Sequence, residues 1–117
     1  MIQITKMFII DKSLVPENII ESIVDTLKNG GSEINDEDDY YDTLHFAIDD
    51  FVSCSNGEVK ELVDELGVLT AIRLYKENYG EFILDDDDDK VYMTLGFNII
   101  KEWFDNYYSY DELITNQ

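Results

Sequence analysis

The sequence predicts a mainly α-helical protein, built as a compact bundle of four to five helices. Three observations support this fold class. Apolar residues recur with helical spacing over most of the chain, turn-forming residues separate the periodic segments, and few runs alternate as a half-exposed strand would. A chain of 117 residues fits a single domain, residues 1–117, whose core needs no disulfide or metal.

Two helices are expected in the first half of the chain. The first begins at Pro16, because proline suits the first turn of a helix, and ends at Asn29-Gly30-Gly31, where glycine can take the left-handed cap conformation. Its apolar stripe contains Ile19, Ile20, Ile23, Val24 and Leu27. The second runs from about residue 38 to residue 52. Helical counting places on its inward face Tyr41, Leu44, Ile48 and Phe51, and on its outward face Asp42, Phe46, Asp49 and Ser53.

Three further helices are expected in the second half. One covers residues 58–66, and its inward residues are Val59, Leu62, Val63 and Leu66. Another covers residues 68–79, and its inward residues are Leu69, Ile72 and Tyr75. The last covers residues 91–108 and is apolar over so wide an arc that it is expected to be central to the bundle.

A small antiparallel β element is the alternative at two places. Residues 1–10 are rich in Ile and alternate in part, which suits either a strand or an apolar lead-in. If residues 82–84 pair with residues 91–93, the five aspartates between them form a hairpin loop. Otherwise that acidic run is a solvated loop or the lead-in to the last helix.

The charge of the chain restricts its partners. Asp and Glu number 27 against 8 Lys and Arg, which gives a formal net charge of -19 and a pI near 4.1. Small domains typically carry a net charge of about 2–8 in magnitude. Direct binding to nucleic acid needs a basic surface and is excluded, and anionic membranes are disfavoured for the same reason. The expected partner is a basic protein, of the kind that itself binds nucleic acid.

The acidic residues concentrate in two segments. The region from Glu33 to Asp50 combines carboxylates with a helical apolar stripe, and no Lys or Arg occurs between Lys28 and Lys60. Such a surface repels itself, so we expect a reason for it outside folding. Phe46 stands among the carboxylates, either as an anchor for a partner or half-buried against a neighbouring helix. The candidate partner-binding residues are Asp36, Glu37, Asp38, Asp39, Asp42, Phe46, Asp49, Asp50, Asp85, Asp86, Asp87, Asp88 and Asp89.

The sequence gives little support to an enzyme, and no catalytic, cofactor-binding or metal-binding residue is assigned. His45 and Cys54 are the only histidine and cysteine, and no motif for nucleophilic catalysis or phosphate binding surrounds them. Calcium binding is a weaker alternative, because neither acidic segment has the ligand spacing of an EF-hand loop. One cysteine, no signal peptide and no bilayer-length apolar run together indicate a cytoplasmic protein.

The residues Leu44-His45, Ala47-Ile48, Asp49-Asp50 and Val52, followed by an acidic helix that ends at Leu66-Gly67, resemble the acidic phage antirestriction proteins typified by Ocr. The resemblance covers about residues 38–67, and outside it size and charge agree. It implies a helical DNA mimic encoded by a phage or mobile element. Such a protein acts in the host cytoplasm and blocks the nucleic-acid-binding groove of a restriction–modification enzyme or a CRISPR effector.

Two interpretations remain open from the sequence. One is this DNA-mimic inhibitor, and the other is an immunity or antitoxin protein that neutralises a basic toxin or nuclease. Both use the same charge complementarity, but the second contacts one cognate protein. The many Tyr and Phe side chains also allow a homodimer.

Overall fold

The computed structural model describes residues 10–29 and 34–110. It contains five helices in that part of the chain and no strand, which confirms the predicted helical bundle. The helices are α1 (Glu17–Asn29), α2 (Glu37–Cys54), α3 (Asn56–Leu66), α4 (Val68–Tyr79) and α5 (Asp88–Tyr107). The possible strand in residues 1–10 lies, apart from Ile10, outside the described residues, and so do Gly30 and Gly31.

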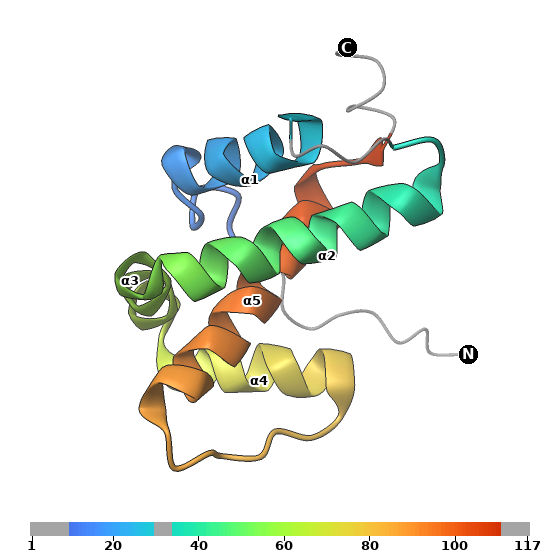
Figure 1. Cartoon of the computed structure of the whole chain (residues 1–117). Helices are drawn as coiled ribbons and strands as arrows, with labels where there is room; N and C mark the ends of the chain where they lie inside the picture. The colour runs from blue at the N-terminus through green and yellow to red at the C-terminus, as the bar shows by residue number, and fades with distance from the viewer. Residues whose placement is uncertain (1–9, 30–33, 111–117) are drawn as a thin grey trace, which may run out of the picture.

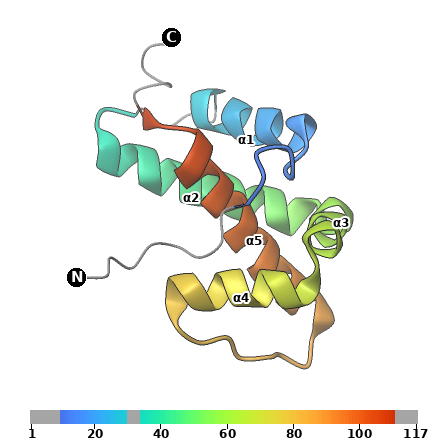
Figure 2. The ribbon, with the colours of Figure 1, turned by 180° about the vertical axis from the view of Figure 1, so that it is seen from behind.

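Helix α5 is the centre of the bundle, as its apolar sequence predicts. It packs against α2, α3 and α4, while α1 packs on α2 (Figure 1). Seen from behind, α1 and α4 again lie at opposite ends of the molecule, with α2 and α5 between them (Figure 2). The middle of α5 is therefore enclosed, and Leu95, Ile99, Ile100 and Phe104 are fully buried.

The contact between α3 and α5 depends on Gly96. This glycine is buried, and a Cβ atom at its position would overlap a γ-methyl group of Val59, whose side chain is itself fully buried. Residue 96 therefore has to be small for the two helices to approach this closely. The next junction, between α3 and α4, is a single residue, Gly67, whose φ of 99° favours glycine.

Two hydrogen bonds tie the segment before α1 to the last turns of α5. The Trp103 indole Nε1 donates to the Lys12 carbonyl oxygen (2.8 Å), and the Tyr107 hydroxyl donates to the Ile10 carbonyl oxygen (2.6 Å). Ile10 and Val15 are buried and belong to the core, while Asp11, Lys12 and Ser13 between them are exposed.

Two inward-facing residues were predicted wrongly. On α2, Tyr41 is 47% exposed and Tyr40 is buried in its place, with its ring 5.9 Å from that of Tyr110. On α4, Leu69 is 79% exposed, and the buried residues are Ala71 and Leu74. On α2 the other predicted residues, Leu44, Ile48 and Phe51, are buried, so only the first turn differs. On α4 the core lies about one residue, or 100° of helix rotation, away from the predicted direction.

The alternative hairpin over residues 82–93 is also wrong. Residues 91–93 belong to α5, which begins at Asp88. Asp87 caps that helix, since its side chain accepts a hydrogen bond from the Asp89 backbone N–H (3.0 Å). Asp88 and Asp89 lie in the first turn, where carboxylates interact favourably with the helix dipole. The aspartate run is thus the lead-in to the last helix.

Candidate interaction surface

The N-terminal end of α2 uses some of its carboxylates to start the helix. Asp36 Oδ1 accepts a hydrogen bond from the Asp39 backbone N–H (2.9 Å), and Asp39 Oδ2 accepts one from the Asn35 backbone N–H (3.1 Å). Glu37 and Asp38 occupy the first turn, near the positive end of the dipole. Four of the predicted partner-binding residues therefore also stabilise the helix, as expected for carboxylates at a helix N-terminus.

The outward face of α2 forms a continuous stripe. We call it the α2 stripe and define it as the exposed residues Asp38, Tyr41, Asp42, His45, Phe46, Asp49 and Asp50. Phe46 is 62% exposed, so the half-buried alternative for this side chain is wrong. The rings of His45 and Phe97 of α5 pack in an edge-to-face arrangement, at a centroid distance of 4.8 Å.

The carboxylates of α2 are dense enough to compare with a DNA strand. Seven of them lie between Asp36 and Asp50, a stretch of about 21 Å at 1.5 Å per residue. This is roughly one charge per 3 Å, against about 3.4 Å per phosphate along one strand of B-DNA. Within the described residues, none of these seven has a Lys or Arg partner within 4.0 Å.

The second predicted acidic segment, Asp85 to Asp89, is exposed and lies away from the start of α2. A shallow pocket lined by Glu37, Tyr41, Asp105 and their neighbours places the start of α2 beside the end of α5. The aspartates lie at the start of α5, about 30 Å away for a helix of this length. The aspartates therefore lie far from the start of α2, whereas Asp89 lines a small pocket with Asn56 and Gly57, which follow the end of α2.

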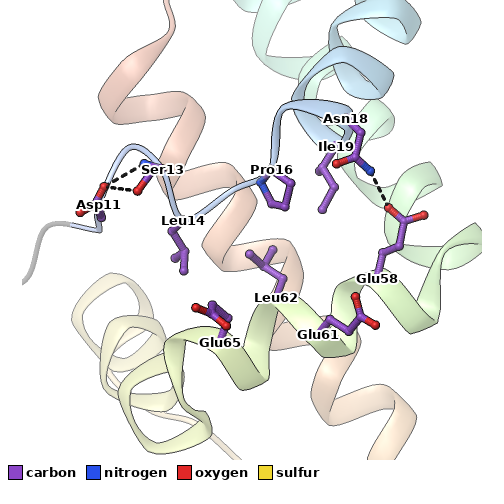
Figure 3. A pocket seen from close by; sticks show the side chains of 10 residues that line it. All are labelled: Asp11, Ser13, Leu14, Pro16, Asn18, Ile19, Glu58, Glu61, Leu62 and Glu65. Atoms are coloured by element: carbon purple, nitrogen blue, oxygen red, sulfur yellow. Dashed lines mark hydrogen bonds between the residues drawn. The ribbon is translucent and has the colours of Figure 1, made fainter.

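A third acidic region was not predicted as a site. Glu58, Glu61 and Glu65 of α3 and Asp11 line a groove of about 640 Å³ between α3 and the segment that leads into α1 (Figure 3). Leu14, Pro16, Ile19 and Leu62 form its apolar part. The spacing of the three glutamates puts them on one helix face, which the sequence could have shown. That Asp11 lines the same groove is a tertiary arrangement that no local pattern reveals.

Local hydrogen bonds affect the electrostatics of this groove. Hydrogen bonds from the backbone N–H (2.8 Å) and the hydroxyl (2.7 Å) of Ser13 lower the pKa of Asp11. Opposite, Asn18 Nδ2 donates to Glu58 Oε2 (3.2 Å). Among the described residues, no Lys or Arg lines the groove.

The positive side chains near these surfaces are mostly engaged elsewhere. Lys101 pairs with Asp105 (3.0 Å). Lys12 lies 5.9 Å from the ring centroid of Tyr107, and Lys60 lies 5.2 Å from that of Tyr92. The pKa of Tyr92 is raised by partial burial of the side chain beside α3 and by Asp64, whose carboxylate accepts a hydrogen bond from the Tyr92 hydroxyl (3.2 Å).

Two polar residues that the sequence analysis did not single out are buried between α4 and α5. Asn98 and Glu102 are each 2% exposed. Asn78 Nδ2 donates to Asn98 Oδ1 (2.9 Å) and to Glu102 Oε1 (3.2 Å), so one α4 side chain joins two turns of α5. This network helps to fix the position of α4 on the central helix.

His45 and Cys54 lie nine residues apart on α2, about 13 Å along its axis, and Cys54 is exposed. In the described part of the chain, His, Cys, Asp and Glu side chains do not gather in groups that could hold a metal ion. None of the helices described there has the length and apolar composition needed to cross a lipid bilayer. No protein-family model, curated protein or solved structure matches this chain.

Proposed function

We propose that this protein is a DNA-mimic inhibitor that occupies the nucleic-acid-binding groove of a basic host protein. The observation that carries the proposal is the charge of α2, whose linear density is close to that of one DNA strand and whose carboxylates have no Lys or Arg within 4.0 Å among the described residues. The target class is a defence enzyme, either a restriction–modification enzyme or a CRISPR effector, and the site of action is the host cytoplasm.

Rigidity makes the charge useful for mimicry. Leu44, Ile48 and Phe51 bury the opposite face of α2 in the core, so the carboxylates are held at fixed positions before any partner arrives. A preorganised ligand loses less conformational entropy on binding than a flexible acidic tail would. The protein offers neither bases nor a cleavable backbone, so it blocks the groove without becoming a substrate.

The α2 stripe also carries apolar groups that charge mimicry alone does not need. Phe46 and Tyr41 are both exposed among the carboxylates. Aromatic side chains at the centre of an interface often supply much of its binding energy, while surrounding charges supply steering and specificity. The same segment carries the resemblance to the Ocr-type antirestriction proteins, which supports the choice of target class.

The first experiment captures the partner and asks whether DNA displaces it. The immobilised protein is incubated with host lysate, and bound proteins are eluted with duplex DNA and then with high salt. We expect duplex DNA to release the specific partner. A partner that holds DNA and this protein at the same time would contradict the proposal. A DNA-insensitive toxin as the partner would favour the immunity or antitoxin interpretation.

The second experiment uses matched charge variants against that partner. The variant Asp42→Asn, Asp49→Asn, Asp50→Asn removes three exposed charges from α2, and the control Glu17→Gln, Glu21→Gln, Asp25→Asn removes three from α1. At roughly 0.5–1 kcal/mol per exposed charge contact, the α2 variant should bind about 10–100-fold more weakly. Equal weakening by both variants would mean that net charge, and not the α2 surface, determines binding.

A further inference from the structure

We propose that a second surface, at the N-terminal end of α5, binds a short apolar and cationic segment of a protein. The surface is a cleft of about 560 Å³ between α4 and the chain that leads into α5, and we call it the loop cleft. Its apolar lining is Tyr75, Tyr79, Phe82, Ile83, Val91 and Met93. The inference rests on the proposed function only in that the partner is a basic protein.

Large apolar side chains are exposed here without cover. Ile83 is 78% exposed, the adjacent Leu84 is 71% exposed, and Tyr79 is 54% exposed. Single exposed apolar residues are ordinary on a protein surface, but neighbouring ones beside a cleft indicate a contact with another molecule. The cleft volume lies within the range of about 300–1,000 Å³ that is typical of ligand sites.

The chain on both sides of Ile83 and Leu84 is held in place. On one side, the ring of Phe82 packs edge-on against Tyr75 (5.2 Å), which in turn contacts Tyr79 (4.6 Å). On the other side, Asp85 Oδ1 accepts a hydrogen bond from the Asp87 backbone N–H (2.9 Å), just before α5 begins. The two aliphatic side chains are therefore presented between fixed points, which lowers the entropic cost of binding.

The negative charge around the cleft indicates which kind of partner can bind there. Glu81 and Asp85 line the cleft, Asp86 to Asp89 follow directly, and Lys90 is the one cation that lines it in the described part of the chain. A second copy of this chain would bring two such aspartate groups together, and an anionic membrane would be repelled in the same way. A protein segment with Lys or Arg beside a large apolar residue satisfies both the apolar lining and the carboxylates.

The test compares two synthetic peptides of equal length and charge, one alternating Lys with Leu and the other alternating Lys with Ser. Binding is followed by amide chemical shifts of the labelled full chain. The disruptive variant is Ile83→Ser, Leu84→Ser. The control is Leu69→Ser, because Leu69 is equally exposed on α4 but does not line the cleft.

We expect the Leu peptide to bind at least about tenfold more tightly than the Ser peptide, with shifts at residues 82–85 and 91–94. The double variant should remove that difference, and the Leu69 control should keep it. Equal binding of the two peptides, or an unchanged difference in the double variant, would overturn the inference. So would a dimer of the free protein that the double variant dissociates. No DNA-binding target is used, so failure here leaves the α2 proposal to its own tests.

Discussion

Gly96 lies where α3 packs against α5, and a single added carbon atom there would disturb the packing of the two helices. We predict that Gly96→Ala lowers the free energy of unfolding by about 1–3 kcal/mol, because the new methyl group would overlap the buried Val59 side chain. Urea unfolding at neutral pH measures the change.

The matched control is Gly57→Ala in α3, where a Cβ atom would meet nothing within 4 Å. Alanine is the better helix former, so this variant should be neutral or stabilised by up to about 1 kcal/mol. A Gly96→Ala protein as stable as the wild type would mean that α3 and α5 can separate at little cost.

Tyr92 links stability to alkaline pH. Its pKa is raised in the folded state, so folding favours the protonated phenol. The resulting stabilisation is present below the unfolded-state pKa, near 10, and is lost as pH rises through the higher folded-state pKa. We predict that the difference in Tm between wild type and Tyr92→Phe shrinks as pH rises from about 9 to above 10. A difference that does not depend on pH would contradict this account.

At the scale of single elements, the N-terminal cap of α2 stabilises the helix independently of any partner. Asp36→Ala removes the side-chain acceptor of the Asp39 N–H and should cost about 0.5–2 kcal/mol of stability. Asp36→Asn keeps an acceptor and should recover most of that loss. Thermal unfolding of the two variants distinguishes the contribution of the hydrogen bond from that of the charge. If both lose stability equally, the charge of Asp36, and not its hydrogen bond, stabilises the helix.

All five helices could be predicted because their apolar periodicity is strong, and the bounds of α4 agree with the structure. The direction of each buried face was harder to predict. On α2, both Tyr40 and Tyr41 lie within one turn of Leu44, so spacing alone cannot choose between them. The choice is made by Tyr110, far away in sequence, whose ring contacts Tyr40. On α4, the small Ala71 faces the core, where counting large residues favoured Leu69.

The candidate surface could likewise be predicted only where it depends on local sequence pattern. The acidic residues of α2 and the exposed Phe46 follow from local pattern, and the structure places Phe46 on one outward face with Asp38, Asp42, Asp49 and Asp50. The placement of Asp85–Asp89 far from the start of α2, and the groove that Asp11 and α3 line together, depend on how helices pack. Such contacts between distant segments have no local signature in one sequence.

For the molecule as a whole, the net charge of -19 has opposite consequences for folding and for binding. Raising NaCl from about 0.01 M to about 0.15 M shortens the Debye length from about 30 Å to about 8 Å. Screening of self-repulsion should then raise the Tm by several degrees, while affinity for a basic partner should fall.

Differential scanning calorimetry and a binding titration over the same salt series measure the two effects. Repeating the series with choline chloride separates screening from specific sodium binding. A Tm that stays constant would show that the carboxylates repel one another too weakly to oppose folding.

The central position of α5 also determines at which stage of its synthesis the protein can fold. Helices α1 to α4 leave the ribosome before the helix on which α2, α3 and α4 pack. A fragment that ends at Asp87 lacks the side chains that close the core, and its short amphipathic helices have little stability alone. We expect it to be largely unstructured by circular dichroism. During synthesis, this nascent chain would therefore stay open until its last helix emerges, and would then fold in a single cooperative step.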